Sequence, residues 1–361
     1  MKGKISAVQF FAIIFLCRIT EFFTYIAPRE TTVAPSDRIF VMLFFLVFCA
    51  AALIPALAFS KKHEKCSVPS LARSVSPFFG GSIASLYIAA LIWTAAESVS
   101  RFELFISTVM FPDTDINIIT AFLLLAAAFA ATKGTEAIGR ASVTVTAVLA
   151  FSFVFILLTS VSEFDAINFT PLLYDGLSPA FGDGFASASR TWEILFFALM
   201  PSVVRGSEAK AASVWLSVFA VVALAGFFVI DGVTGMYGER QMFKLYTLTV
   251  LAKLGILERF DDVLIGIWVL CELIKATFCA TAASKALEDG FGKKSPKYFY
   301  LIFVAAVFAV FTAAAGSVGR FAEIAGSTVA KLCFWTCAAV LPAVTAIAYK
   351  ASTKKAVIGY A

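Results

Sequence analysis

The chain has 361 residues, of which 60% are hydrophobic, and its mean hydropathy is +0.90. A soluble domain has about 45–50% apolar residues, whereas apolar runs of about 18 residues or more recur along this whole chain, as is typical of transmembrane helices. The net charge of +5 comes from basic residues in short loops between these runs, so it does not indicate nucleic-acid binding. The composition predicts an all-α polytopic membrane protein, a single transmembrane domain of residues 1–361 in the lipid bilayer.

The reactive side chains are few and are not spaced for chemistry. The seven cysteines lie mostly inside apolar runs and show neither disulfide nor metal-ligand spacing. The single histidine, His63, lies in a basic loop, which gives no support to histidine-based catalysis or metal binding. No cleavable signal peptide is evident. We therefore expect a protein that is not an enzyme and that uses no cofactor and no metal ion.

Ten apolar segments are long enough to cross a bilayer as helices. In chain order they are Ser6–Ala27, Ile39–Phe59, Pro77–Met110, Ile116–Thr132, Ala141–Val161, Ala186–Val204, Ala211–Ile230, Val263–Ala286, Tyr298–Ala315 and Val329–Tyr349. The gap after the fifth segment divides the chain into a first repeat of about residues 5–161 and a second of about residues 186–349. Because each repeat has an odd number of spans, the two repeats are inverted relative to each other in the membrane.

The distribution of lysine and arginine predicts how the spans are oriented. With the N-terminus inside, the inner loops carry almost twice as many of these residues as the outer segments, in agreement with the positive-inside rule. Both termini are therefore expected in the cytoplasm. The outer segment 231–262 contains the stretch Arg240–Leu257, which mixes apolar residues with Lys244 and Lys253. This pattern favours an amphipathic helix at the membrane interface, and a lid over a site is the alternative.

Two short stretches place charged residues inside apolar spans at matching positions of the two repeats. Arg18-Ile19-Thr20-Glu21 lies in the first span and Arg190-Thr191-Trp192-Glu193 in the sixth, so both are expected in the outer half of the membrane. Ionised side chains at this depth are costly unless they face a protein interior, and they are therefore candidate site residues. Arg and Glu can neutralise each other within each stretch, and Arg18 can equally pair with Glu193 across the helices.

Further charged residues lie in the third span, which carries Glu97, Arg101 and Glu103, and in the eighth, which carries Glu272 and Lys275. Each intramembrane cation thus has an acid three or four residues away, as burial in a low dielectric demands. Three roles are open for these pairs: fixing the helix register, binding a ligand or a coupling proton, and snorkelling to the interface. Because acids exceed cations here, at least one acid is a candidate for protonation or for cation exchange.

Uncharged residues near these groups are weaker candidates. Trp93 and Trp192 are placed to wall a pocket, although aromatic residues inside spans usually only pack. Thr277 offers a hydroxyl in the eighth span, where a hydrogen bond to its own helix backbone is the alternative. Pro201 lies inside the sixth span, where it predicts a kink.

A set of residues also follows a characteristic order along nearly the whole chain: Ile5-Ser6 with Gln9, then Pro28, Pro171, Gly176, Glu193, Pro201, Tyr237-Gly238-Glu239 through Tyr246, Arg259 with Asp261 and Asp262, Trp268, and Ala286-Leu287. No single motif in this set is highly specific. Together with the ten spans, the ordered set resembles the endospore germination permeases, the integral-membrane B subunits of spore germinant receptors.

This resemblance implies a LeuT-like fold of two inverted five-helix repeats, as in the amino acid–polyamine–cation superfamily. It implies a site where the first and sixth helices unwind, with the third and eighth helices beside them. It also implies that the protein senses a small nutrient, often an amino acid, at the inner membrane of a dormant spore. The implied partners are an A subunit with cytoplasmic domains and a lipoprotein C subunit.

The chain departs from the family pattern at both expected breaks. No glycine occurs between Gly3 and Gly80, and Trp192 stands where a small residue usually precedes the sixth-span glutamate. Whether the two helices unwind is therefore open, and Arg18, rather than exposed backbone amides, is the expected anchor for a ligand carboxylate.

The sequence thus predicts a germinant-receptor permease subunit that binds an amino acid without covalent chemistry. Arg18 attracts the ligand carboxylate, and Glu193, Glu21 or Glu97 answers its ammonium or carries a coupling ion. Two alternatives remain: an amino acid or cation symporter of the same superfamily, and a ligand-blind structural or ion-release channel subunit. The candidate ligand-binding residues are Arg18, Thr20, Glu21, Trp93, Glu97, Thr191, Trp192, Glu193, Glu272 and Thr277.

Overall fold

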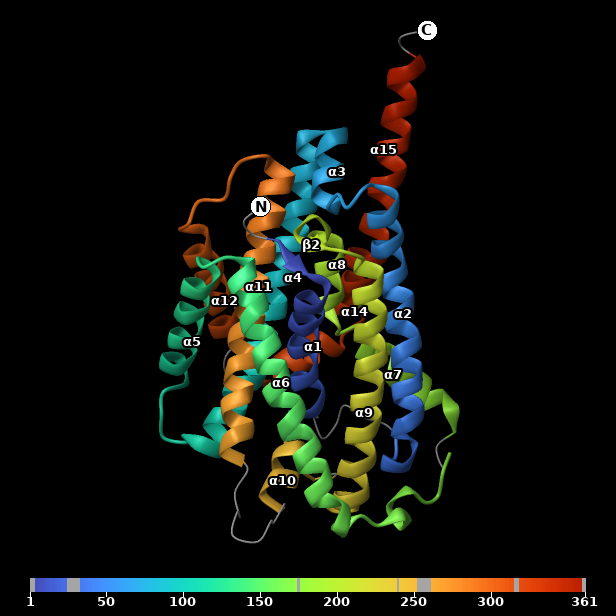
Figure 1. The fold of residues 1–361 in the computed structure, drawn as a ribbon, viewed down its shortest axis with the longest axis vertical. Helices are drawn as coiled ribbons and strands as arrows, with labels where there is room; N and C mark the ends of the chain where they lie inside the picture. The colour runs from blue at the N-terminus through green and yellow to red at the C-terminus, as the bar shows by residue number, and fades with distance from the viewer. Residues whose placement is uncertain are drawn as a thin grey trace.

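The computed structural model describes residues 4–24, 33–173, 176–238, 240–251, 261–314 and 318–358. The described chain is almost entirely helical, as the composition predicts (Figure 1). Its strands are two short segments, β1 (Ile5–Ser6) and β2 (Val204–Arg205), which pair in parallel. This pairing joins the start of the first helix to a segment some 200 residues further along the chain.

The described residues of the first half form five long helices and one short one. A capping box begins the first of them: the Ser6 hydroxyl accepts from the Gln9 amide at 3.2 Å, and the Gln9 side chain accepts from the Ser6 amide at 2.8 Å. In chain order the elements are α1 (Ala7–Thr24), the 3₁₀ turn η1 (Pro35–Asp37), α2 (Arg38–Lys62), α3 (Val68–Val75), α4 (Pro77–Phe105), the π-helical turn η2 (Ile106–Met110), α5 (Ile116–Ala131) and α6 (Thr135–Ser160).

The second half is more interrupted. In chain order it comprises the 3₁₀ turns η3 (Val161–Glu163) and η4 (Ala166–Phe169), α7 (Leu177–Ala188), the 3₁₀ turn η5 (Trp192–Ile194), α8 (Leu195–Leu199), the 3₁₀ turn η6 (Pro201–Val203), α9 (Glu208–Gly238), α10 (Lys244–Leu251), α11 (Asp261–Phe291), α12 (Phe299–Ala314), α13 (Val318–Gly326), α14 (Thr328–Trp335), the π-helical turn η7 (Thr336–Val340) and α15 (Leu341–Ile358). The last helix extends beyond the rest of the bundle in Figure 1.

The described residues include six helices that are long and apolar enough to cross a membrane, and three shorter apolar helices. These positions coincide with nine of the ten segments expected from the sequence. Large apolar side chains face outward on several of them, for example Phe122, Phe151 and Val221, as hydrocarbon surroundings require. The chain is therefore a multi-pass membrane protein, and the count of ten spans stays a prediction.

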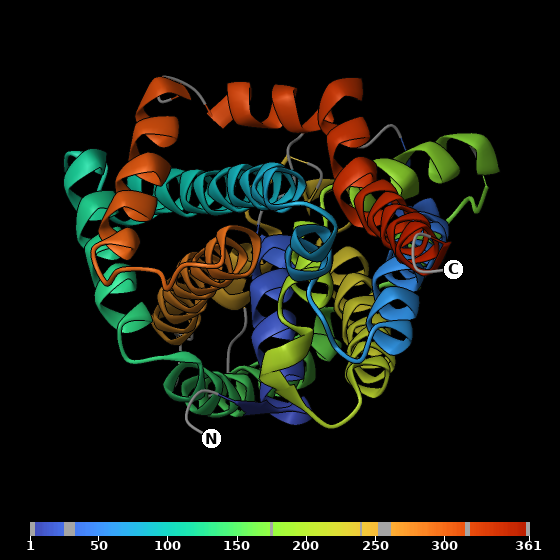
Figure 2. The same ribbon diagram turned by 90° about the horizontal axis from the view of Figure 1, so that it is seen from above.

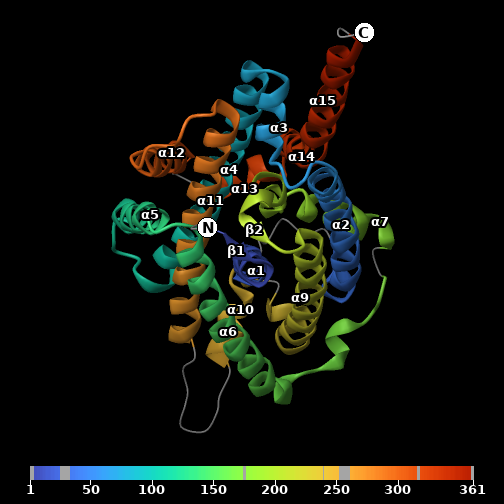
Figure 3. The same ribbon diagram turned by 45° about the horizontal axis from the view of Figure 1, so that its top comes forward.

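Helix α11 is the centre of the bundle. Seen from above, it lies inside a ring made by α4, α12, α5, α6 and α1 (Figure 2), and it packs against all five. It carries two buried charged residues, Glu272 and Lys275. The view in Figure 3 shows β1 and β2 side by side close to α1, so the broken part of the second half also reaches this centre.

The expected span Ala186–Val204 is not a continuous helix. Helix α7 ends at Ala188, and only 3₁₀ turns and the five-residue α8 follow before β2. Pro201 explains the second interruption, because it lacks an amide hydrogen and its ring clashes with a preceding carbonyl. At the first interruption, the Phe185 carbonyl accepts both from the Ser189 hydroxyl at 2.8 Å and from the Ser189 amide at 3.0 Å.

The structure describes residues 240–251 of the stretch that was expected to form an amphipathic helix. Within them α10 has eight residues, and Lys244, Leu245, Leu248 and Thr249 are buried. The aromatic ring of Phe243, just before α10, lies 5.0 Å from that of Phe105 at the end of α4. Helix α10 is therefore packed onto the bundle, and its role as a lid over a site stays a prediction.

Gly235 shows how tightly the end of α9 is held. Its φ is +46°, and a Cβ added there would lie 2.5 Å from Oδ1 of Asn168. We expect Gly235→Ala to lower the free energy of unfolding by about 1–3 kcal/mol, because alanine is strained in this conformation. Gly182→Ala is the matched control, since that glycine lies in α7 with open space around it. Thermal unfolding in detergent measures both, and equal midpoints for the two variants would contradict this account.

Candidate functional site: a charged junction of three elements

At the break after α7, Arg18 of α1 binds two backbone carbonyls, one of which, that of Ser187, also accepts from the backbone amide of Arg190 at 3.2 Å. The guanidinium of Arg18 donates to the carbonyl of Ser187 at 3.4 Å and to that of Arg190 at 3.5 Å. A cation at the C-terminal end of a helix is favourable because that end carries partial negative charge. The Arg18 guanidinium also lies 5.4 Å from the centre of the Phe45 ring. Arg18 therefore stabilises the very break that the sequence left open.

Glu193 lies in the turn η5, and its carboxylate forms an ion pair with a lysine that the sequence pattern did not assign to it. Lys275 Nζ lies 2.7 Å from Glu193 Oε1 and also donates to the carbonyl of Cys17 at 3.3 Å. Both charged side chains are at most 2% exposed. One ammonium thus ties together α1, η5 and α11, and the expected direct pair of Arg18 with Glu193 is replaced by the pair of Lys275 with Glu193.

Only one of the two carboxylate oxygens of Glu193 has a hydrogen-bond partner among the described residues. Its Oε2 is buried and has no hydrogen-bond partner among the residues that the structure describes. A buried carboxylate oxygen without a donor is costly. In a membrane-spanning bundle it therefore marks a place where a ligand cation gains from binding.

Arg18 and Glu193 share one neighbourhood although they do not pair. Arg18 donates to the carbonyl of Arg190, three residues before Glu193. The Cys49 sulfur of α2 lies 3.7 Å from the hydroxyl oxygen of Thr191, which belongs to the same broken segment as Glu193. The side chains of Arg18, Thr191 and Glu193 are each at most 4% exposed. Three of the ten candidate residues are thus brought together at one buried junction.

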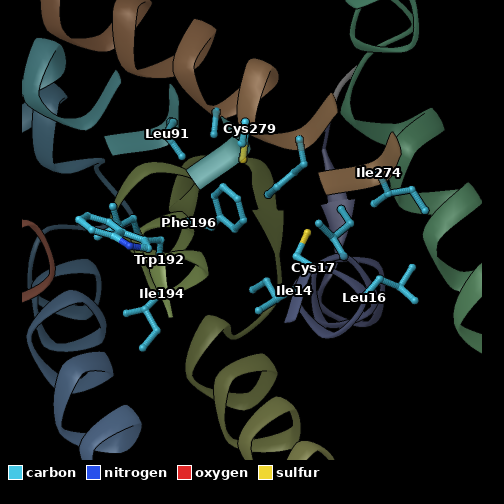
Figure 4. Close-up of a cluster of buried hydrophobic side chains, with 14 of the residues drawn as sticks. Ile14, Leu16, Cys17, Leu91, Trp192, Ile194, Phe196, Ile274 and Cys279 are labelled. Carbon is cyan, nitrogen blue, oxygen red and sulfur yellow. The ribbon is translucent and has the colours of Figure 1, made fainter. Parts of the chain in front are cut away.

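A cluster of buried apolar side chains lies next to this junction. Figure 4 shows the ring of Phe196 between Ile14 and Cys17 of α1 and Cys279 of α11. Phe196 makes an edge-to-face contact with Phe278 at 4.7 Å between ring centroids. Because these side chains exclude water, charges at the junction act on each other and on a ligand in a low dielectric.

The acids of α4 and α11 form a second polar cluster next to the junction. Glu97 pairs with Arg101 one helical turn away, as the sequence spacing predicts. Glu272 accepts from the hydroxyl of Ser98 at 2.5 Å and from the indole of Trp268 at 3.1 Å. Glu272 therefore joins α11 to α4. The sequence spacing had indicated a pair with Lys275 on its own helix and gave no sign of this contact between helices.

The remaining candidates are spread around these clusters. Trp192 packs edge-on against Phe334 of α14 at 5.5 Å, and Trp93 lies 5.4 Å from Phe321 of α13. The Thr277 hydroxyl donates to the Leu273 carbonyl of its own helix, which is the alternative stated for it. Residues 20 and 21 belong to α1, but the side chains of Thr20 and Glu21 lie outside the described residues.

The sequence also gave little sign of a second buried ion cluster at the far end of α2. Arg38 Nη1 lies 2.7 Å and Lys244 Nζ 3.6 Å from Oδ1 of Asp231 in α9, and all three side chains are at most 5% exposed. Arg38 and Lys244 read as loop charges because they flank apolar segments. The cluster fastens α10 to α2 and α9.

The fold and the buried charged junction define a class: multi-pass membrane proteins with the LeuT-type transporter fold. The structure of MhsT in complex with L-phenylalanine is similar over 98% of this chain and 100% of that chain, with a TM-score of 0.64 and 12% identity. Two mutants of the Eremococcus coleocola manganese transporter are similar over 96% of this chain and 77% of theirs, with TM-scores of 0.53 and 0.51 and 12% identity. Identities this low show the fold alone.

The family is shown by a sequence model. The model described as spore germination protein matches residues 4–317, and the chain belongs to this family of spore permeases. Among curated protein sequences none matches the chain well enough to count as a relative. The resemblance read from the ordered residues is therefore confirmed, and the family and the fold together support a permease-like role.

Proposed function

We propose that this protein is the permease subunit of a spore germinant receptor and that it binds an amino acid at the junction of α1, η5 and α11. The observation that carries the proposal is the Glu193 carboxylate, which is fully buried in a break of the helical chain and binds Lys275 with only one of its two oxygens. A ligand ammonium placed at Oε2 gains a charge-assisted hydrogen bond in a water-poor site. No other described residue competes for that oxygen.

Arg18 supplies the second anchor. Its bonds to the carbonyls of Ser187 and Arg190 measure 3.4 and 3.5 Å, longer than the usual range of about 2.7–3.2 Å. A carboxylate is a stronger acceptor than a peptide carbonyl and matches the planar guanidinium. An amino acid with its ammonium at Glu193 and its carboxylate at Arg18 therefore bridges α1 and the broken segment. Thr191 and Trp192 directly precede Glu193 in the sequence.

Ligand binding at this junction is expected to change the arrangement of α1 and the broken segment and so to produce the receptor's response. The ligand contacts α1 and the broken segment, which are held together by Lys275 and by the pairing of β1 with β2. If the ligand binds one arrangement of these elements more tightly than another, it shifts their populations. In a germinant receptor the shift passes to the A subunit and the lipoprotein C subunit. The receptor lies in the inner membrane of the spore, and both termini of this chain face the cytoplasm.

A ligand panel tests the proposal. The full chain is purified with its two partner subunits, and thermal unfolding midpoints are measured with each amino acid in turn. We expect at least one amino acid to raise the midpoint, as any ligand specific for the native state must. Arg18→Ala should abolish that shift, since it removes the carboxylate anchor. A panel without any shift would favour the ligand-blind structural or ion-release subunit, and ligand uptake into vesicles by the chain alone would favour a symporter.

A further inference from the structure

A cavity lies against the face of α1 that carries Phe11, Phe15 and Ile19. It has a volume of about 310 Å³ and is bounded by α1, α6, α9, α10 and α11. Phe11, Phe15 and Ile19 form its α1 wall, Val218 belongs to its α9 wall, and Trp268 belongs to its α11 wall. Fourteen of its sixteen lining residues are apolar. Such a cavity stays empty of water, so its occupant is recognised through apolar contact alone.

The mouth of this cavity opens on the membrane-facing surface. Val154, which lines it on α6, is 54% exposed. On the outer faces of the same two helices, Phe151 of α6 and Val221 of α9 are 74% and 68% exposed. In a multi-pass membrane protein these side chains face hydrocarbon rather than water. The cavity is therefore continuous with the lipid phase.

The shape of the cavity suits an extended hydrocarbon chain. Phe11, Phe15 and Ile19 stand four residues apart on one face of α1, so the face that they make is about 12 Å long at a rise of about 1.5 Å per residue. At its inner side Phe15 and Ile19 are only 4% and 3% exposed. An acyl chain reaching them leaves the bulk bilayer and packs between helices.

We propose that this crevice binds one acyl chain of a membrane phospholipid and that contact with the bound chain stabilises the position of α1. Cys17, whose carbonyl accepts from Lys275, lies two residues from Phe15 and Ile19 and so on the other face of the helix. The acyl chain therefore packs on the face of α1 that carries Phe11, Phe15 and Ile19. Trp268 contacts both the crevice and the buried acid of α11, because its ring lines the crevice while its Nε1–H donates to Glu272. This inference does not depend on what the charged junction binds.

Photolabelling tests the proposal directly. The full chain is reconstituted in vesicles of phosphatidylethanolamine and phosphatidylglycerol that contain a phosphatidylglycerol with a diazirine halfway along one acyl chain. After illumination, adducts are located by peptide mass spectrometry. We expect adducts on Phe15 and Ile19, which bulk lipid does not reach, as well as on the exposed reference residue Phe151. A phosphatidylglycerol with the diazirine in its headgroup should label neither Phe15 nor Ile19.

A matched pair of variants on α9 shows whether the crevice holds the lipid. Val218→Trp points an indole into the crevice, whereas Val221→Trp adds the same group on the exposed face of the same helix. Because an indole buries about 150–250 Å², Val218→Trp should reduce the labelling of Phe15 and Ile19 at least about tenfold, and Val221→Trp should leave it unchanged. Ala150→Phe, from the α6 wall, is the second filling variant if Val218→Trp does not fold.

Three results would overturn the proposal. The first is a wild-type chain labelled at Phe151 but not at Phe15 or Ile19. The second is undiminished labelling of the two α1 residues in the filling variants. The third is equal labelling of these residues by the headgroup probe, which would mean that a polar group rather than an acyl chain enters the crevice.

Discussion

Lys275→Met is expected to lower the free energy of unfolding by about 3–5 kcal/mol, because it leaves the buried charge of Glu193 without its partner. The pair is at most 2% exposed, with 2.7 Å between nitrogen and oxygen. Methionine keeps most of the length of the lysine side chain, so the variant removes the charge and little of the packing. Thermal or denaturant unfolding of the full chain in detergent measures the loss.

Two further variants make this result specific. Lys210→Met removes an exposed lysine near the start of α9 and should change stability by at most about 0.5 kcal/mol. The double variant Glu193→Gln with Lys275→Met should be more stable than the sum of its single changes predicts, by about 0.5–3 kcal/mol. Additive effects in this cycle would show that Lys275 and Glu193 do not interact.

Glu193→Gln should raise the amino-acid concentration needed for a half-maximal response by at least about tenfold. A hydrogen bond to a charged group contributes about 1.5–3 kcal/mol, and about 1.4 kcal/mol corresponds to a tenfold change in affinity. Glutamine keeps an acceptor for Lys275, so the fold is retained better than in Lys275→Met. Germination of a host carrying the variant receptor, titrated with the ligand, gives the midpoint.

The control for this titration is another glutamate of the chain. Glu136 is half exposed near the start of α6 and lies 3.9 Å from Arg140, so Glu136→Gln should leave the midpoint unchanged. The Glu193 variant must also accumulate to wild-type levels. An unchanged midpoint at normal accumulation of the variant would show that Glu193 does not take part in ligand binding.

The transmembrane helices are the part of this fold that the sequence predicts well. A helix such as α2 or α6 crosses the membrane because about 20 consecutive residues are apolar, and this property needs no knowledge of neighbours. The break between Ala188 and Trp192 is different. The segment there contains Ser189, Arg190 and Thr191, and two carbonyls beside it accept hydrogen bonds from Arg18, which lies 169 residues away from Ser187 in the chain. A local pattern carries no signal for such a contact.

The pairing of charges was predictable only within one helix. Glu97 and Arg101 are four residues apart, so helical spacing alone puts them together. Glu193 and Lys275 are 82 residues apart and meet only after α11 has packed beside α1 and η5. The sequence did show that ionisable residues inside spans require partners. The long, flexible side chain of Lys275 allowed more than one partner, and tertiary packing selected Glu193.

The structure of the receptor with its bound amino acid is the most direct test of the central proposal. We predict ligand density between α1 and the segment from Ser189 to Glu193, with the ligand nitrogen within hydrogen-bonding distance of Glu193 Oε2 and Lys275 still on Oε1. Density at any other place in this chain, or on a partner subunit while Oε2 stays without a partner, would contradict it.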